Sequence, residues 1–340
     1  MNLKNLPFRL LGTWYNLGAL VAPTRTGQRL LRLFATPPRP RIRPKEQRFL
    51  DQARLDRDTL REWGGVVYHW DHPGQGHPAQ GHPEQGHSRE NNTDHPYVLL
   101  SYGWGYNAGR WRHYVPQLLE AGYRVVAYDP PGHGHASANT LVLPQNIKIV
   151  RHLITTLGPP HAVMAHSFGG GTVIAALADL PVRYHPKRMV LMASFSRATW
   201  IFRNFQYRLG LTEYAYQTLV ANIERRARQR LTDFDVARRS SQLVRTQGMI
   251  VHDPDDTTTH YRNALRYHQY WPNSTLLPAP GAGHHLGTPT VTEYILAFLI
   301  EAKVPETALP PTQPLPPYHD LIRFFAGLEA GTVERPVRIP

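Results

Sequence analysis

A serine between small residues, at the end of an apolar run, is the first feature of the chain that could carry chemistry. Residues 161–164 (HAVM) lead into Ala165-His166-Ser167-Phe168, and three glycines follow. Small neighbours let a strand reverse sharply into a helix, which would leave the hydroxyl of Ser167 exposed at the strand tip. A serine hydroxyl becomes a good nucleophile when an imidazole takes its proton and a buried carboxylate holds that imidazole. An ordinary strand-to-helix turn is the alternative interpretation, so the rest of the chain must decide.

Two later segments carry the carboxylates and imidazoles that such chemistry needs. Residues 252–256 (HDPDD) follow one apolar run, and residues 280–286 (PGAGHHL) follow the next. Because the carboxyl ends of parallel strands meet at one edge of a sheet, side chains placed there converge on a common site. The residues alone leave several aspartates and two adjacent histidines open as candidates.

The turn around Ser167 resembles the G-x-S-x-G nucleophile elbow of the α/β-hydrolase superfamily, with Ala165 in place of the first glycine. The family order of serine, acid and histidine implies that Ser167 is the nucleophile. The acid is then Asp256, the fourth residue after His252, and the base is His284 in a loop like the family's G-x-G-H.

Under this resemblance the neighbouring candidates are structural. Asp253 and Asp255 are expected to form the turn by accepting hydrogen bonds from local backbone. His285 is the neighbour of the base. In a turn, adjacent side chains point in different directions, so only one residue of each pair can reach the site.

Residues 102–105 (YGWG) resemble the family's His-Gly-x-Gly loop, whose backbone N–H groups stabilise an oxyanion. The resemblance implies that the N–H groups of Trp104 and Phe168 form this oxyanion hole. Tyr102 replaces the usual histidine, which leaves open how the loop is stiffened. Residues 129–134 (DPPGHG) resemble a structural turn of the family, so His133 is not expected to be catalytic.

Apolar runs alternate with helical patterns from residue 65 to residue 302. Continuous runs, without polar alternation, predict strands covered on both faces. We therefore predict an α/β-hydrolase fold: a mostly parallel, doubly wound sheet with helices on both faces and a helical lid insertion. The expected strands are 65–70, 97–101, 123–128, 161–165, 188–192, 249–251 and 275–277, and the expected helices are 111–121, 143–157, 168–180, 259–270 and 291–302.

The predicted organisation has five parts. These are a basic helical N-terminal arm (1–64), the first part of the core (65–193), a helical lid (194–246), the second part of the core (247–302) and a Pro-rich C-terminal extension with a short helix (303–340). A lid over Ser167 would exclude water and shape an acyl pocket. The aromatic candidates to line that pocket are Trp200, Phe202, Phe205 and Tyr207.

Within the first part of the core, residues 71–96 are rich in His, Gly, Pro and Gln, with units of five residues that repeat from Gly76. This composition cannot bury apolar area, so a solvated spacer is favoured over a Zn²⁺ or Ni²⁺ site. No metal site is therefore expected there, and the serine hydrolase that the resemblance implies requires no cofactor.

The N-terminal arm places apolar residues at three- and four-residue steps beside cations, and the formal net charge of the chain is +13. Two interpretations stay open for the arm: packing on its own domain, which we favour, and peripheral contact with a membrane. The run is too interrupted for a transmembrane helix or a signal peptide. A cytoplasmic protein, with membrane association left open, is therefore expected. No nucleic-acid partner is expected, and the oligomeric state is not predicted.

The sequence contains no cysteine, which removes disulfides, thiolate metal sites and a cysteine nucleophile. We predict a serine hydrolase that cleaves carboxylic esters of small-molecule substrates through an acyl-enzyme on Ser167. A thioesterase or acyltransferase with the same triad is one alternative. A non-catalytic binding scaffold of the same fold is the other.

Overall fold

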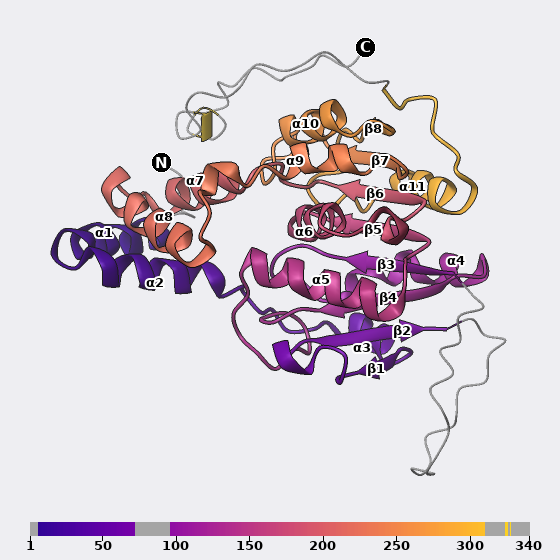
Figure 1. Ribbon diagram of the computed structural model, residues 1–340, viewed down its shortest axis with the longest axis horizontal. Helices are drawn as coiled ribbons and strands as arrows, with labels where there is room; N and C mark the ends of the chain where they lie inside the picture. Colours follow the sequence, from indigo (N-terminus) through magenta and orange to yellow (C-terminus); the bar gives the residue numbers. More distant parts are fainter. Residues whose placement is uncertain (1–5, 72–95, 310–323, 326, 328–340) are drawn as a thin grey trace, which may run out of the picture.

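The computed structural model describes residues 6–71, 96–309, 324, 325 and 327, which build an eight-stranded sheet at the centre of the molecule (Figure 1). The strand order is β1-β2-β4-β3-β5-β6-β7-β8; β2 runs antiparallel to β1 and to β4, and all other pairs are parallel. The strands are β1 (Arg54–Asp56), β2 (Val66–Trp70), β3 (Tyr97–Ser101), β4 (Arg124–Asp129), β5 (Ala162–His166), β6 (Arg188–Met192), β7 (Gln247–His252) and β8 (Ser274–Pro278).

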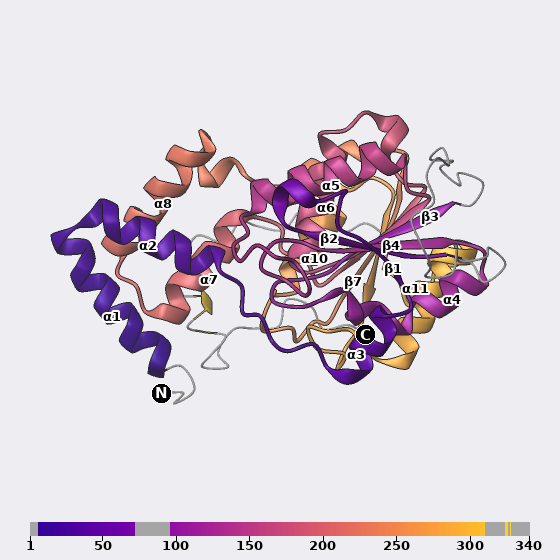
Figure 2. The ribbon, with the colours of Figure 1, turned by 90° about the horizontal axis from the view of Figure 1, so that it is seen from below.

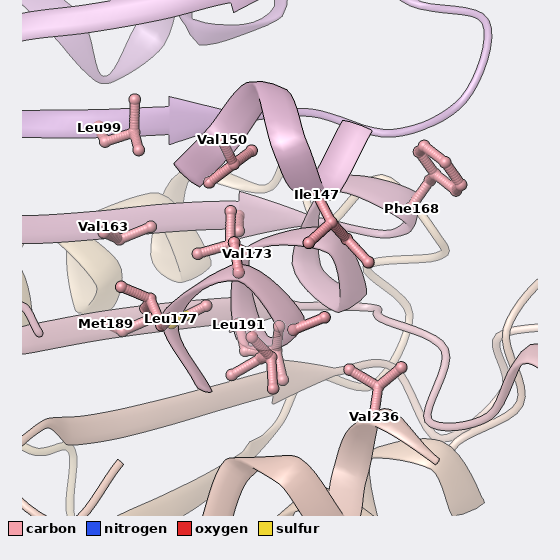
Figure 3. Close-up of a cluster of buried hydrophobic side chains, with 14 of the residues drawn as sticks. Leu99, Ile147, Val150, Val163, Phe168, Val173, Leu177, Met189, Leu191 and Val236 are labelled. Atoms are coloured by element: carbon pink, nitrogen blue, oxygen red, sulfur yellow. The ribbon is translucent and has the colours of Figure 1, made fainter. Parts of the chain in front are cut away.

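Helices cover both faces of this sheet, as the continuous apolar strands predicted. One face packs on α5 (Leu143–Leu157), α6 (Phe168–Ala178), α9 (Val236–Arg239) and α10 (Arg262–Tyr270), and Figure 3 shows part of that core. The other face packs on α3 (Pro44–Leu50), α4 (Val115–Glu120) and α11 (Pro289–Glu301). Successive strand residues enter opposite cores: Val163 lies in the first and Met164 in the second.

A separate group of four helices lies beside the sheet (Figures 1 and 2). We call α1 (Leu6–Val21), α2 (Pro23–Ala35), α7 (Ala198–Leu209) and α8 (Glu213–Ala227) the helical group. Helices α1 and α7 approach so closely at Gly12 that a side chain there would overlap the carbonyl oxygen of Leu209. The side chain of Asn16 also donates to Gly210 O at 3.0 Å and accepts from Thr212 N at 2.8 Å. The N-terminal arm therefore packs on the segment that was expected to form the lid.

The N-terminal arm was expected to be helical as far as residue 64, which was wrong beyond Leu50, where α3 ends. Residues 54–56 instead form the edge strand β1, which pairs with β2. The Asp56 carboxylate ends this strand by accepting from Asp58 N at 2.8 Å and Thr59 N at 3.0 Å, a local turn that competes with helix formation. Residue 64 is thus no boundary between a helical arm and the sheet.

Other expectations fall largely outside the described residues. These are the His-rich loop over 71–96, apart from its two end residues, and most of the C-terminal extension. Within that extension, Phe324 and Phe325 pack against the Trp200 ring, with centroids 5.5 and 5.0 Å away. Among the helices that the structure describes, none has both the length and the apolar character of a membrane span.

Candidate active site

Ser167 occupies the turn between β5 and α6 in a strained backbone conformation, with φ 53° and ψ −118°. A non-glycine residue rarely adopts such angles, and strain of this kind clusters at functional sites. The following glycines let the turn close. A Cβ on Gly169 would lie 2.5 Å from Tyr102 O, and a Cβ on Gly170 would lie 2.6 Å from Ser194 Oγ. The Ser167 hydroxyl is thereby presented at the carboxyl end of a central strand.

His284 and Asp256 stand in line with that hydroxyl. His284 Nε2 lies 3.1 Å from Ser167 Oγ, and His284 Nδ1 lies 2.7 Å from Asp256 Oδ2. Ser167 follows β5, Asp256 follows β7 and His284 follows β8, so the carboxyl ends of three strands of one sheet bring the three side chains together. With the Nδ1 proton donated to Asp256, Nε2 is free to accept the proton of the serine hydroxyl.

The Asp256 carboxylate is buried and richly hydrogen-bonded. Its Oδ1 accepts from Thr258 N at 2.7 Å and Thr259 N at 3.1 Å, and the Thr259 hydroxyl lies 3.0 Å from Oδ2. Burial pushes the pKa of Asp256 upward, but hydrogen bonds from His252 and His284 outweigh it and hold the pKa below its usual range. The carboxylate is therefore ionised beside His284 at neutral pH.

The loop after β3 lies directly against Ser167. A Cβ on Gly103 would lie 2.9 Å from Ser167 Cβ, so only glycine fits there without displacement. The Trp104 ring meets the Phe168 ring edge to face, with centroids 4.9 Å apart. Phe168 begins α6, so its N–H belongs to the first helical turn, where amides lack helical acceptors. Trp104 and Phe168 thus lie close together beside Ser167, and the oxyanion role of their N–H groups stays a prediction.

Tyr102 holds this loop by a bond that the sequence did not reveal. Its hydroxyl donates to Asp129 Oδ1 at 2.5 Å. The Asp129 carboxylate is fully buried and also accepts from Tyr68 OH, Ala108 N and His135 N at 2.7 to 2.9 Å. Tyr102 therefore anchors the loop to the end of β4, at the position where the family usually has histidine.

The neighbouring candidates point elsewhere. His285 is exposed, and its ring lies 2.8 Å from the Tyr106 hydroxyl. Asp255 is exposed, whereas Asp253 is buried and accepts from the N–H groups of Asp255 and Gly283 at 2.9 and 2.5 Å. Asp253 thus ties the turn after β7 to the loop that carries the histidines.

Three residues of the site were missed by the sequence reasoning. Thr259 contacts Asp256 as described above, and His252 Nε2 lies 3.3 Å from Asp256 Oδ2. His166 Nε2 lies 2.8 Å from His284 O, and burial, followed by the nearby Arg110, lowers the pKa of His166 well below its usual value. A neutral His166 therefore donates to the backbone of the His284 loop. In the sequence, only the position of His166 next to Ser167 indicates that it belongs to the site.

An apolar cavity of about 230 Å³ opens next to Phe168, between the first residues of α5 and α6 and the helical group. Its lining includes Leu31 and Phe34 of α2 and Phe202 of α7, so the N-terminal arm forms part of the wall. Of the four aromatics expected to line such a pocket, Phe202 does so. Phe205 packs on Phe34, and Trp200 and Tyr207 pack on Phe325.

Among the described residues, no group of three or more histidine, aspartate or glutamate side chains is arranged to hold a metal ion.

Comparison with known proteins agrees with this architecture. A family model described as "alpha/beta hydrolase fold" matches residues 96–243, and a second, described as "TAP-like protein", matches residues 229–310. The structure of Est1E from Butyrivibrio proteoclasticus with bound ferulic acid superposes with a TM-score of 0.52 at 17% identity, over 75% of this chain and 98% of that one.

Curated relatives are similar over shorter stretches. A monoacylglycerol lipase of Mycolicibacterium smegmatis is 33% identical over 26% of this chain and 34% of its own length. A pimeloyl-[acyl-carrier protein] methyl ester esterase of Edwardsiella ictaluri is 34% identical over 27% of this chain and 33% of its own length. The match thus spans about a third of each relative. The two family models overlap at residues 229–243 and together match residues 96–310, from which we conclude that this chain belongs to the α/β-hydrolase superfamily.

Proposed function

We propose that this protein is a serine hydrolase that cleaves carboxylic esters, with Ser167 as nucleophile, His284 as base and Asp256 as acid. One observation carries the proposal: the hydrogen-bonded line from Ser167 Oγ through His284 to the buried Asp256 carboxylate, at 3.1 and 2.7 Å. The strained backbone of Ser167 supports it, because such strain is stable only where the surrounding structure enforces it.

The proposed reaction has two halves. Ser167 Oγ attacks the ester carbonyl carbon while His284 Nε2 takes the hydroxyl proton, and the new oxyanion is stabilised by the N–H groups of Trp104 and Phe168. Collapse breaks the ester C–O bond, and His284 gives the proton to the leaving alcohol. Water then repeats the attack on the acyl-enzyme, His284 again shuttles the proton, and a carboxylic acid is released.

The substrate is proposed to carry an apolar acyl group. The cavity beside Phe168 supports this, because its walls are mostly aliphatic and aromatic side chains and include Phe168, the residue that follows the nucleophile. The names of two relatives, a monoacylglycerol lipase and a methyl ester esterase, favour ester chemistry for this chain.

The test is hydrolysis of p-nitrophenyl esters of graded acyl length by the full chain and its variants. Ser167→Ala and His284→Ala should each lower turnover by up to roughly 10⁶, because loss of either residue disables the whole triad. His285→Ala is the matched control and should retain most turnover, since its side chain points away from Ser167. Activity that survives in Ser167→Ala, or that disappears in His285→Ala but not in His284→Ala, would contradict the proposed assignment. No hydrolysis of any ester by the folded protein would favour a binding scaffold.

A further inference from the structure

Helix α1 exposes an apolar stripe to solvent. Leu10, Trp14, Leu17 and Val21 follow one another at steps of four, three and four residues, so they share one side of the helix. Their side chains are 65%, 54%, 62% and 87% exposed. Phe8, Leu11 and Leu20 add to the exposed apolar surface of the same helix. A contiguous patch of large apolar side chains on a protein surface marks an interaction site.

The stripe is not the face by which α1 packs on the protein. Gly12, Tyr15 and Ala19 are buried, and they lie on the opposite side of the helix. Gly12 contacts the backbone of α7, and Asn16 hydrogen-bonds the turn between α7 and α8. The helix lies at the edge of the molecule (Figures 1 and 2). It is held in place by one face, so the apolar stripe stays exposed.

The segment that carries this stripe is rich in basic residues. The first 45 residues contain no aspartate or glutamate and nine basic residues: Lys4, Arg9, Arg25, Arg29, Arg32, Arg39, Arg41, Arg43 and Lys45. On α2, Arg25, Arg29 and Arg32 are exposed, and the Arg29 guanidinium lies 5.8 Å from the centre of the Trp14 ring. Aliphatic and indole side chains beside exposed arginines are typical of helices that lie in the interface of an anionic membrane.

We propose that the α1 stripe docks on a lipid surface that carries anionic headgroups. The 16 residues of α1 would lie in the plane of the membrane over about 24 Å, with the apolar stripe among the acyl chains and the α2 arginines at the phosphates. A second copy of the chain fits less well, because two such faces would bring their arginines together. The inference does not depend on the proposed ester hydrolysis.

The experiment is co-sedimentation of the full chain with vesicles of phosphatidylcholine alone or mixed with phosphatidylglycerol. Binding should rise with phosphatidylglycerol and fall between 0.1 and 1 M salt, as the screening length drops from about 10 Å to about 3 Å. Trp14→Glu/Leu17→Glu should weaken binding by about a hundredfold or more, because two buried apolar contacts are lost. Arg25→Gln/Arg29→Gln should weaken binding to the mixed vesicles by about fivefold for each charge removed.

Val182→Glu is the matched control, since Val182 is a 40% exposed apolar residue outside the helical group, and it should bind like the parent. Circular dichroism and thermal unfolding show that each variant is folded. Failure of the parent to bind either vesicle would overturn the proposal. A parent dimer that Trp14→Glu/Leu17→Glu dissociates, with no vesicle binding, would overturn it in favour of a second copy.

Discussion

The hydrogen bond from Tyr102 to Asp129 is expected to contribute both to stability and to turnover, and these two contributions can be measured separately. Tyr102→Phe removes one of four hydrogen bonds to a fully buried carboxylate and leaves the other three in place. A hydrogen bond to a charged group contributes about 1.5 to 3 kcal/mol. The free energy of unfolding should therefore fall by about that amount, which urea denaturation followed by circular dichroism measures.

Turnover should fall as well, because Tyr102 begins the loop that carries Trp104 past Ser167. Loss of one oxyanion donor costs on the order of 10² to 10³ in turnover, and a loosened donor should cost less, about tenfold. Tyr68→Phe is the matched control. It removes a hydrogen bond to Asp129 Oδ2 from β2, outside this loop.

The assay is turnover of a p-nitrophenyl ester under conditions where both variants remain folded. Tyr68→Phe should lose a similar amount of stability and keep most of its turnover, while Tyr102→Phe loses both. Equal turnover in the two variants would refute the idea that Tyr102 positions the oxyanion loop. Unchanged stability in both would refute the assignment of Asp129 as a buried carboxylate that needs its donors.

Three further predictions concern the acid, the pH response and the cavity. Asp256→Asn should lower turnover on the order of 10⁴, while Asp255→Asn, whose residue is exposed, should keep most of it in the same ester assay. Burial, followed by the charge of His252, lowers the pKa of His260 to about 4. The unfolded chain, with an imidazole pKa near 6.5, then binds more protons than the native state between pH 6.5 and 4. This group should thus cost up to about 3 kcal/mol of stability as pH falls through that window, and urea titrations of His260→Gln should show a shallower loss than the parent. Ala227→Trp, at an exposed wall of the cavity, should lower the ratio of octanoate to acetate ester turnover, and an unchanged ratio would mean that the acyl chain lies elsewhere.

Much of the sheet could be predicted because its strands are continuous apolar runs that are buried on both faces. The edge strand β1 was missed because three residues with no apolar pattern form it, and only pairing with β2 makes them a strand. The Ser167, Asp256 and His284 positions follow strands, so their convergence could be expected from topology. Their catalytic roles stay a prediction.

Contacts between distant segments could not be predicted from local patterns. Tyr102 and Asp129 are 27 residues apart, and neither motif predicts their hydrogen bond. The association of α1 with α7 and α8 joins residues almost 200 positions apart through close backbone approach at Gly12. From the sequence alone, Gly12 only interrupts an apolar helix, because its contact with Leu209 is not visible there.

The most direct test of the central claim is covalent labelling of the parent protein with a fluorophosphonate, followed by intact mass and peptide mapping. A serine activated by His284 should take up one equivalent of the probe at Ser167, and labelling should be abolished in Ser167→Ala and strongly slowed in His284→Ala. Folded parent protein that stays unlabelled, or that is labelled at another serine, would contradict the claim that Ser167 is the nucleophile.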